Sequence, residues 1–124
     1  MLNIYAYTKA IVNFIKEKGL PKLAHVHVAF KAGILALWTK KRWKTPYIIS
    51  EHSTIYLEES DNSLIDTSIF FRKTTSRVLK NASRLTVVST YLGKAIQKHY
   101  PFVNYITIPN VVDTAIFACR KSHV

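Results

Sequence analysis

The chain has 124 residues, of which 48% are hydrophobic and 20% are charged, and its formal net charge is +11. This length suits one domain with a sizeable core, and the hydrophobic fraction argues against a disordered chain. The single cysteine, Cys119, cannot form an intrachain disulfide, so we expect a reducing, cytoplasmic location. No stretch is long and apolar enough to span a bilayer, and Lys9 and Lys16 interrupt what would be the apolar core of a signal peptide.

The first half of the sequence predicts two helices and two strands. Apolar residues three and four positions apart predict an amphipathic helix over 4–18. The apolar run at 23–30 predicts a buried strand. Helical composition returns at 32–43, and the β-branched and aromatic run at 47–50 predicts a second strand.

The second half continues the alternation. The polar segment 51–62, which holds four of the seven acidic residues, predicts a loop, and 63–81 predicts one long helix or two short ones. A strand at 85–89, a helix at 91–100 and a strand at 105–108 follow. Apolar strands separated by helices predict a Rossmann-like α/β fold, with a parallel sheet of about four strands and helices on both faces.

Polar side chains follow all four predicted strands. Ligands of open parallel sheets bind beyond the carboxyl ends of the strands, so these side chains are the candidate site residues. They are His27, Glu51, His52, Ser89, Thr90, Asn110 and Asp113. A histidine at a strand exit, such as His52, can hold a sugar hydroxyl or a phosphate, or act as a general acid or base. The alternative is that His52 only caps the end of its strand.

Other chemistries are poorly supported. His25 and His27 are two residues apart and face the same side of a strand, but no further ligands are near, so we expect no metal site. We expect His25 to pack inside against a helix and His27 to reach the cleft edge. Ser53 and Ser89 do not lie in a Gly-x-Ser-x-Gly turn, and the three glycines stand too far apart for a phosphate-binding loop, so we expect no cofactor.

The basic residues fall mostly on the predicted helices. They can form a solvated face, or bind an anionic membrane through the KKRWK cluster at 40–44 with Trp38 nearby, or bind nucleic acid. The base-stacking motifs of RNA-recognition modules are missing, and the aromatic residues follow helical spacings that suit a core. The sequence therefore argues against nucleic acid as the partner.

Three segments together resemble a known family. They are HVHVAFKAGILALWTKKRWKTPYIISEHS, NASRLTVVSTYLGKAI and ITIPNVVDTAIF, which lie in this order between residues 23 and 117. Each is similar to an element of the N-terminal domain in family 4 glycosyltransferases of the GT-B fold. The resemblance implies a retaining sugar transfer from a nucleotide-sugar to a glycan or lipid-linked acceptor. In that family this domain mainly holds the acceptor, and a second domain holds the nucleotide.

The resemblance also assigns roles to the candidate residues. His52 matches the histidine that contacts the donor sugar, and we take it as the catalytic candidate. Ser89 and Thr90 match positions that line the cleft between the domains. Asn110 and Asp113 match the strand exit that leads toward the hinge. His27 and Glu51 complete the predicted substrate-binding set.

The chain departs from the family pattern at both ends. The Gly-rich loop after the family's first strand would precede residue 1, and the donor-binding C-terminal domain would follow residue 117. We therefore expect residues 1–124 to form one partial domain that is inactive alone. A strand left unpaired at the sheet edge would favour a homo-oligomer, and the basic helices would favour peripheral contact with the inner membrane face.

Overall fold

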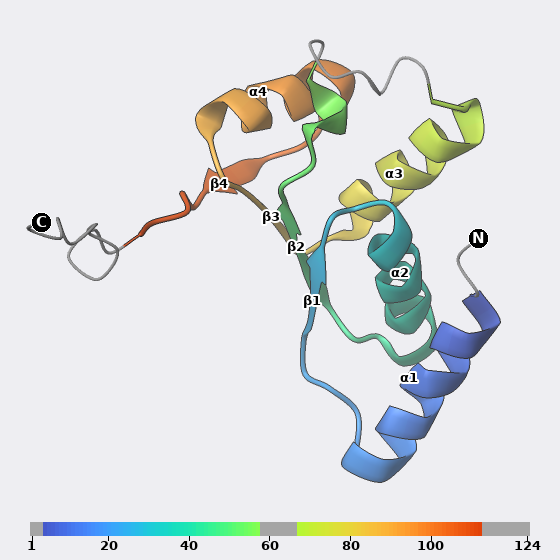
Figure 1. The fold of residues 1–124 in the computed structure, drawn as a ribbon. Coiled ribbons are helices and arrows are strands. Elements are labelled where there is room, and N and C mark those ends of the chain that lie inside the picture. Colours follow the sequence, from blue (N-terminus) through green and yellow to red (C-terminus); the bar gives the residue numbers. More distant parts are fainter. Residues whose placement is uncertain (1–3, 58–66, 113–124) are drawn as a thin grey trace, which may run out of the picture.

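A computed structural model describes residues 4–57 and 67–112 of the chain (Figure 1). The elements are, in order, α1 (Ile4–Lys18), β1 (Ala24–His27), α2 (Lys31–Trp43), β2 (Tyr47–Glu51), the 3-10 helix η1 (Thr54–Tyr56), α3 (Ile69–Asn81), β3 (Arg84–Val87), α4 (Thr90–His99) and β4 (Tyr105–Thr107). This order confirms the predicted alternation of helices and strands. The predicted loop contains η1 in addition, and the first part of the predicted helix 63–81 lies partly outside the described residues.

The four strands form one parallel sheet in the order β1-β2-β3-β4. One row of the register runs across all of them, pairing Val26 with Ile49, Ile49 with Leu85, and Leu85 with Tyr105. A helix connects each strand to the next, as parallel pairing requires. The predicted α/β, Rossmann-like fold class is confirmed.

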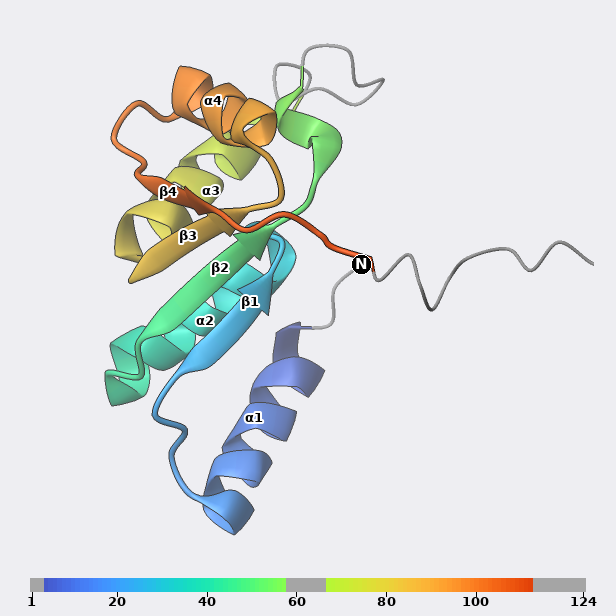
Figure 2. The same ribbon diagram turned by 90° about the vertical axis from the view of Figure 1, so that its left-hand side faces the viewer.

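The three connecting helices α2, α3 and α4 lie on the same face of this sheet (Figures 1 and 2). Right-handed crossovers that always step to the next strand in one direction place every helix on one side. The opposite face carries no helix within residues 4–57 and 67–112, so the expected covering of both faces is met on one face only. We call it the open face; it bears His25, His27, Ile48, Ser50, Arg84, Thr86 and Ile106.

Burial along β2 follows from this one-sided arrangement. Tyr47, Ile49 and Glu51 point toward the helices and are buried, whereas Ile48 and Ser50 on the open face are partly exposed. The core between sheet and helices contains Val26, Leu37, Ile49, Val78, Leu79, Leu85, Val87, Leu92 and Ile96. The sheet therefore has one dry face and one accessible face.

Close packing of α2 on α3 depends on Gly33. A Cβ atom at Gly33 would lie 2.4 Å from Cγ1 of Val78, which is fully buried. The Tyr47 hydroxyl donates a hydrogen bond of 2.6 Å to the Val78 carbonyl oxygen and so joins β2 to α3. These contacts fix α2 against α3, and α3 against the amino end of β2.

Helix α1 lies beyond the edge of β1 (Figure 2). None of its residues is buried, although Tyr7, Phe14 and their apolar neighbours form one stripe. An apolar hollow of about 420 Å³ separates this stripe from α2 and β1. None of the helices in the described part of the chain is long and apolar enough to cross a membrane.

Candidate functional site at the carboxyl edge of the sheet

The predicted site residues were selected because they follow strands, and the parallel sheet brings the strand ends together. Strands β1, β2, β3 and β4 end at His27, Glu51, Val87 and Thr107. In the sheet register His27 is opposite Ser50, and Glu51 is opposite Val87. This edge of the sheet is therefore the place where the loops that follow the strands meet.

Glu51 is fully buried and holds two of these loops. Its Oε2 atom accepts hydrogen bonds from the backbone N–H of Ala29, at 2.9 Å, and from the Tyr56 hydroxyl, at 3.2 Å. Its Oε1 atom accepts from the backbone N–H groups of Ser53, at 2.9 Å, and His52, at 3.1 Å. All four donors belong to the protein, so Glu51 positions the loops around the predicted substrate site.

Tyr56 remains protonated and continues to donate to this carboxylate. Burial raises the pKa of the Tyr56 hydroxyl strongly, and the negative charge of Glu51 raises it further. The hydrogen bond from Tyr56 is therefore present at any physiological pH. Tyr56 also belongs to η1, so the contact fixes this short helix against the end of β2.

His52 and His27 lie side by side at this edge. Their rings are stacked, with centroids 5.9 Å apart and an angle of 13° between the planes. Both side chains are exposed, while the backbone N–H of His52 is held by Glu51. The structure thus brings the catalytic candidate His52 and the binding candidate His27 together as an accessible pair of imidazoles.

The prediction that His25 packs inside against a helix is wrong. His25 is exposed on the open face, its ring centroid is 4.4 Å from that of His27, and its Nε2 atom lies 2.7 Å from Ser50 Oγ. Ser50 Oγ lies 2.9 Å from Thr86 Oγ1 in the next strand. The reason for the difference is that this face has no helix against which His25 could pack.

The backbone turns sharply directly after His27. Val28 has a φ of 68°, in the left-handed region that β-branched residues rarely adopt. Its N–H donates to the Ser50 carbonyl oxygen at 3.1 Å, and the turn directs the next N–H, from Ala29, toward Glu51. Strain of this kind costs about 1–3 kcal/mol and is concentrated at functional sites.

A cavity of about 370 Å³ opens beside His27, which lines it, whereas His52 does not. Its walls are largely apolar and are formed by Val28, Phe30, Ile55 and Phe71. The rings of Phe30 and Phe71 pack with centroids 3.9 Å apart. The polar lining includes His27, Lys31 and Ser53. We call this space the edge cavity.

The N-terminus of α2 adds positive potential to the edge cavity. Phe30 precedes the helix and provides no side-chain cap, so the N–H groups of the first turn keep their capacity to donate. Lys31 is the first residue of the helix and lines the cavity. An uncapped helix start with a lysine favours an anionic group at this mouth.

The other predicted site residues lie apart from the edge cavity. Ser89 caps α4, and its Oγ atom accepts a hydrogen bond of 3.2 Å from the Leu92 N–H. Thr90 and Asn110 are exposed, and neither they nor Ser89 line the cavity. Asp113 lies outside the described residues. The structure therefore joins His27, Glu51 and His52 locally, while Ser89 has a capping contact of its own.

Of the described residues that line the cavity, only His27 belongs to the predicted set; Lys31, Ser53 and Phe71 are among those missing from it. Lys31 and Ser53 follow the exits of β1 and β2 closely, and that position was an available signal for both. Phe71 lies in the first turn of α3, and its contact with Phe30 has no counterpart in the sequence pattern. Such a long-range contact emerges only once the helices pack.

Comparison with known families agrees with this architecture. The family model described as Glycosyltransferase Family 4 matches residues 2–116. The chain therefore belongs to the family 4 glycosyltransferases, and its fold is consistent with the N-terminal domain of the GT-B architecture. The predicted resemblance is confirmed, and a glycosyltransferase-type function follows from the family. No curated protein matches the chain.

Proposed function

We propose that this chain forms the acceptor-side domain of an enzyme that transfers a sugar from a nucleotide-sugar to a lipid-linked acceptor, and that it is inactive alone. The observation that carries the proposal is the edge cavity, which combines apolar walls with Lys31 and an uncapped helix start. A lipid-linked acceptor has the matching chemistry, because it joins a hydrocarbon chain to a phosphate. A plain glycan, the other acceptor considered, would make little use of the Phe30 and Phe71 rings.

The histidine pair supplies the polar chemistry in this proposal. His52 contacts the donor sugar, as the family resemblance implies, and His27 beside it binds the acceptor. Glu51 keeps the backbone of His52 in place through the bond to its N–H. As the family resemblance implies, Ser89 and Thr90 line the cleft between this domain and the nucleotide-binding domain, and Asn110 and Asp113 belong to the segment that leads toward the hinge.

The acceptor part of the proposal is tested by titrating farnesyl phosphate into the full chain and recording amide NMR shifts. We expect saturable shifts at Lys31, Ala32 and Ser53. Lys31→Gln should weaken binding roughly tenfold, because a charge-assisted hydrogen bond contributes about 1.5 kcal/mol. Lys22→Gln removes the same charge from an exposed residue outside the cavity and serves as the control. Equal loss in both variants would overturn the proposal.

The donor part is tested by calorimetry with a panel of nucleotide-sugars. We expect no binding by the chain alone at roughly millimolar concentrations, because the nucleotide is assigned to another domain. Donor binding at millimolar or tighter affinity would contradict this division of roles. Release of free nucleotide by the chain alone would contradict its proposed inactivity.

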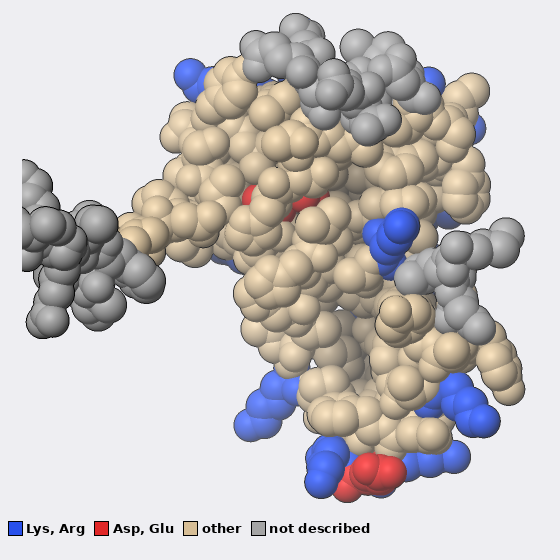
Figure 3. Space-filling view, in the orientation of Figure 1, with Lys and Arg blue, Asp and Glu red and all other residues tan. Residues whose placement is uncertain are grey.

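A second candidate function is a basic module that binds the inner face of an anionic membrane. Glu17 and Glu51 are the only acidic residues in the described part of the chain. Lysine and arginine gather at the end of the molecule where α1 and α2 finish (Figure 3). Vesicles with anionic lipid and a short RNA, each compared at low and high salt, distinguish the partners. We expect salt-sensitive binding to vesicles only, and binding to neither polyanion would eliminate this candidate.

A further inference from the structure

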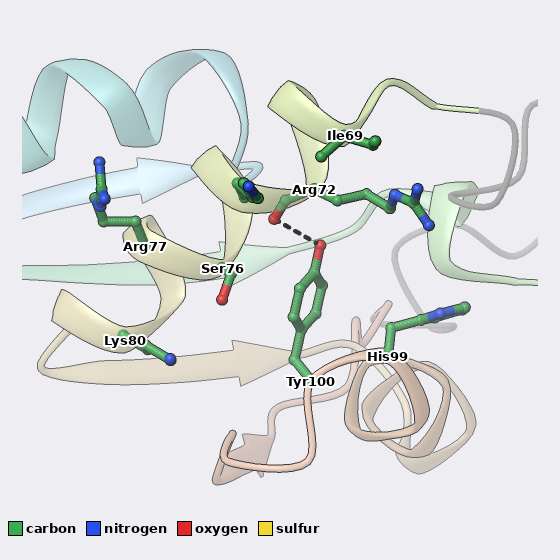
Figure 4. A pocket seen from close by; sticks show the side chains of 8 residues that line it. Ile69, Arg72, Ser76, Arg77, Lys80, His99 and Tyr100 are labelled. Atoms are coloured by element: carbon green, nitrogen blue, oxygen red, sulfur yellow. Dashed lines mark hydrogen bonds between the residues drawn. The ribbon is translucent and has the colours of Figure 1, made fainter.

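A third hollow lies between α3 and the end of α4, and the site proposed above uses none of its residues. Its volume is about 540 Å³, and Figure 4 shows the side chains that line it. We call it the α3–α4 pocket. Its charged members are Arg72, Lys73, Arg77 and Lys80 of α3, and His99 lies at the end of α4. Among the described residues that line it there is no acid.

The four cations of α3 are placed where they repel one another. Lys73 and Arg77 are four residues apart, and Arg77 and Lys80 are three apart, so they are neighbours on one side of the helix. All four side chains are exposed. A bound anion would remove this repulsion by lying between them.

The helix dipole does not account for the whole cluster. Lys80 lies in the last turn of α3, where a cation is favoured. Arg72 and Lys73 lie close to the start of the helix, where the dipole disfavours a positive charge, and the first turn holds no acid to balance them. The helix dipole therefore accounts for Lys80 but not for Arg72 and Lys73.

The floor of the pocket is polar and fixed. The Tyr100 hydroxyl donates to the Arg72 carbonyl oxygen at 3.3 Å, which ties the end of α4 to α3 (Figure 4). Ser76, half-buried, offers a hydroxyl on the same wall as the cations. The Lys80 Nζ atom lies 4.8 Å from the centre of the Phe102 ring, a contact that restrains its side chain.

We propose that the α3–α4 pocket binds a dianionic phosphate group, either a phosphomonoester or a diphosphate. Two arginines offer planar, bidentate donors to phosphate oxygens, and two lysines add compact charge. The Ser76 hydroxyl and the His99 ring complete a set of donors on one concave surface. The group can come from a free phosphate compound or from a lipid headgroup with the same chemistry.

The proposal is tested by titrating inorganic pyrophosphate into the full chain and following amide NMR shifts. We expect saturable shifts at Ser76, Arg77 and Tyr100 and none at Lys31. The double variant Arg77→Gln/Lys80→Gln should weaken binding at least tenfold. The control Lys9→Gln/Lys94→Gln removes the same charge from exposed positions on α1 and α4 outside the pocket and should change binding less than twofold.

Vesicles identify the source of the phosphate. Phosphatidic acid presents a phosphomonoester, whereas phosphatidylglycerol presents a singly charged diester. If the chain prefers phosphatidic acid over phosphatidylglycerol and the pocket variant abolishes this preference, the phosphate belongs to a lipid headgroup. If the chain binds pyrophosphate without this preference, the phosphate belongs to a free compound. Equal weakening by pocket and control variants, or no saturable binding of either probe, overturns the proposal. These results are independent of the Lys31 test, so each site can fail alone.

Discussion

Glu51 is the residue on which the geometry of the candidate site depends most. It is fully buried, yet it accepts hydrogen bonds from three backbone N–H groups and from Tyr56. A buried carboxylate is tolerated only when its oxygens are satisfied in this way. The same four bonds hold the loops that carry His52 and follow His27, so both the geometry of the site and the stability of the fold depend on Glu51.

Replacing this carboxylate should therefore be costly. Glu51→Gln puts an amide donor where the protein already supplies donors, and at least one backbone N–H loses its partner. We expect the free energy of unfolding to fall by about 1–3 kcal/mol. Urea unfolding followed by tryptophan fluorescence measures the change. Glu17→Gln, on the exposed side of α1, is the matched control and should have no effect. Equal stability of both variants would show that the four bonds contribute little.

The histidine pair could be predicted from the sequence, whereas the turn at Val28 could not. The meeting of His27 and His52 was predictable, because both follow strands and parallel strands end at one edge. The left-handed turn at Val28 was not, because a β-branched residue argues against positive φ. Local preference is overridden there by the bonds to Ser50 and Glu51 that the turn makes available.

At the scale of elements, glycines decide how closely helices approach their neighbours. Gly33 of α2 faces the fully buried Val78, whereas Gly93 of α4 faces the ring of the half-buried Tyr105. Valine is stiff and enclosed, so it cannot retreat from an added methyl group. Tyr105 is only half-buried and lies in the edge strand β4, so its ring is less enclosed than Val78.

Adding one methyl group at each position should separate these cases. Gly33→Ala should destabilise the protein by about 1–3 kcal/mol through overpacking. In Gly93→Ala the helix propensity of alanine offsets the crowding by up to about 1 kcal/mol, so the net loss should be smaller. Thermal unfolding by circular dichroism compares the two variants with the parent chain. A larger loss for Gly93→Ala would contradict the packing described here.

The positions of the elements were largely predictable, and the placement of the helices was not. Periodicity located the described α-helices and strands but not the 3-10 helix η1, because helical and extended segments bury different patterns and a single short turn shows no such pattern. Apolar strands were taken to mean helices on both faces. Strand order and crossover handedness decide whether the helices cover one face or both, and the periodicity of the sequence predicts neither of them. Burial alternates along β2 because helices cover one face only, and Ile48 and Ser50 lie on the open face.

At the scale of the molecule, the outer edge of β1 has no strand beside it within the described residues. The β1 strand pairs with β2 alone, and α1 beyond its edge leaves an apolar hollow. An unpaired parallel edge offers backbone donors and acceptors to another chain. We therefore expect the isolated chain to form dimers or larger assemblies. A constant monomer mass by light scattering over a wide concentration range would count against this pairing.

The buried tyrosines predict how stability changes at alkaline pH. Burial raises the pKa of Tyr47 from 10.0 to about 12, and it raises the pKa values of Tyr56 and Tyr100 as well. These hydroxyls ionise more readily in the unfolded chain, so their contribution to stability is complete below about pH 10 and is lost as the pH rises toward about 12. Urea unfolding at several pH values should show this decline. Tyr47→Phe should flatten it, and an unchanged slope would contradict the assignment.

The sequential strand order has a consequence for how the chain is made. Ala24 pairs with Tyr47, Ile48 with Arg84, and Leu85 with Tyr105, so each strand adds to the one that left the ribosome before it. None of the four described strands has to insert between two strands that were made before it. The sheet can therefore grow vectorially during synthesis, one βα unit at a time, from the amino end toward the carboxyl end.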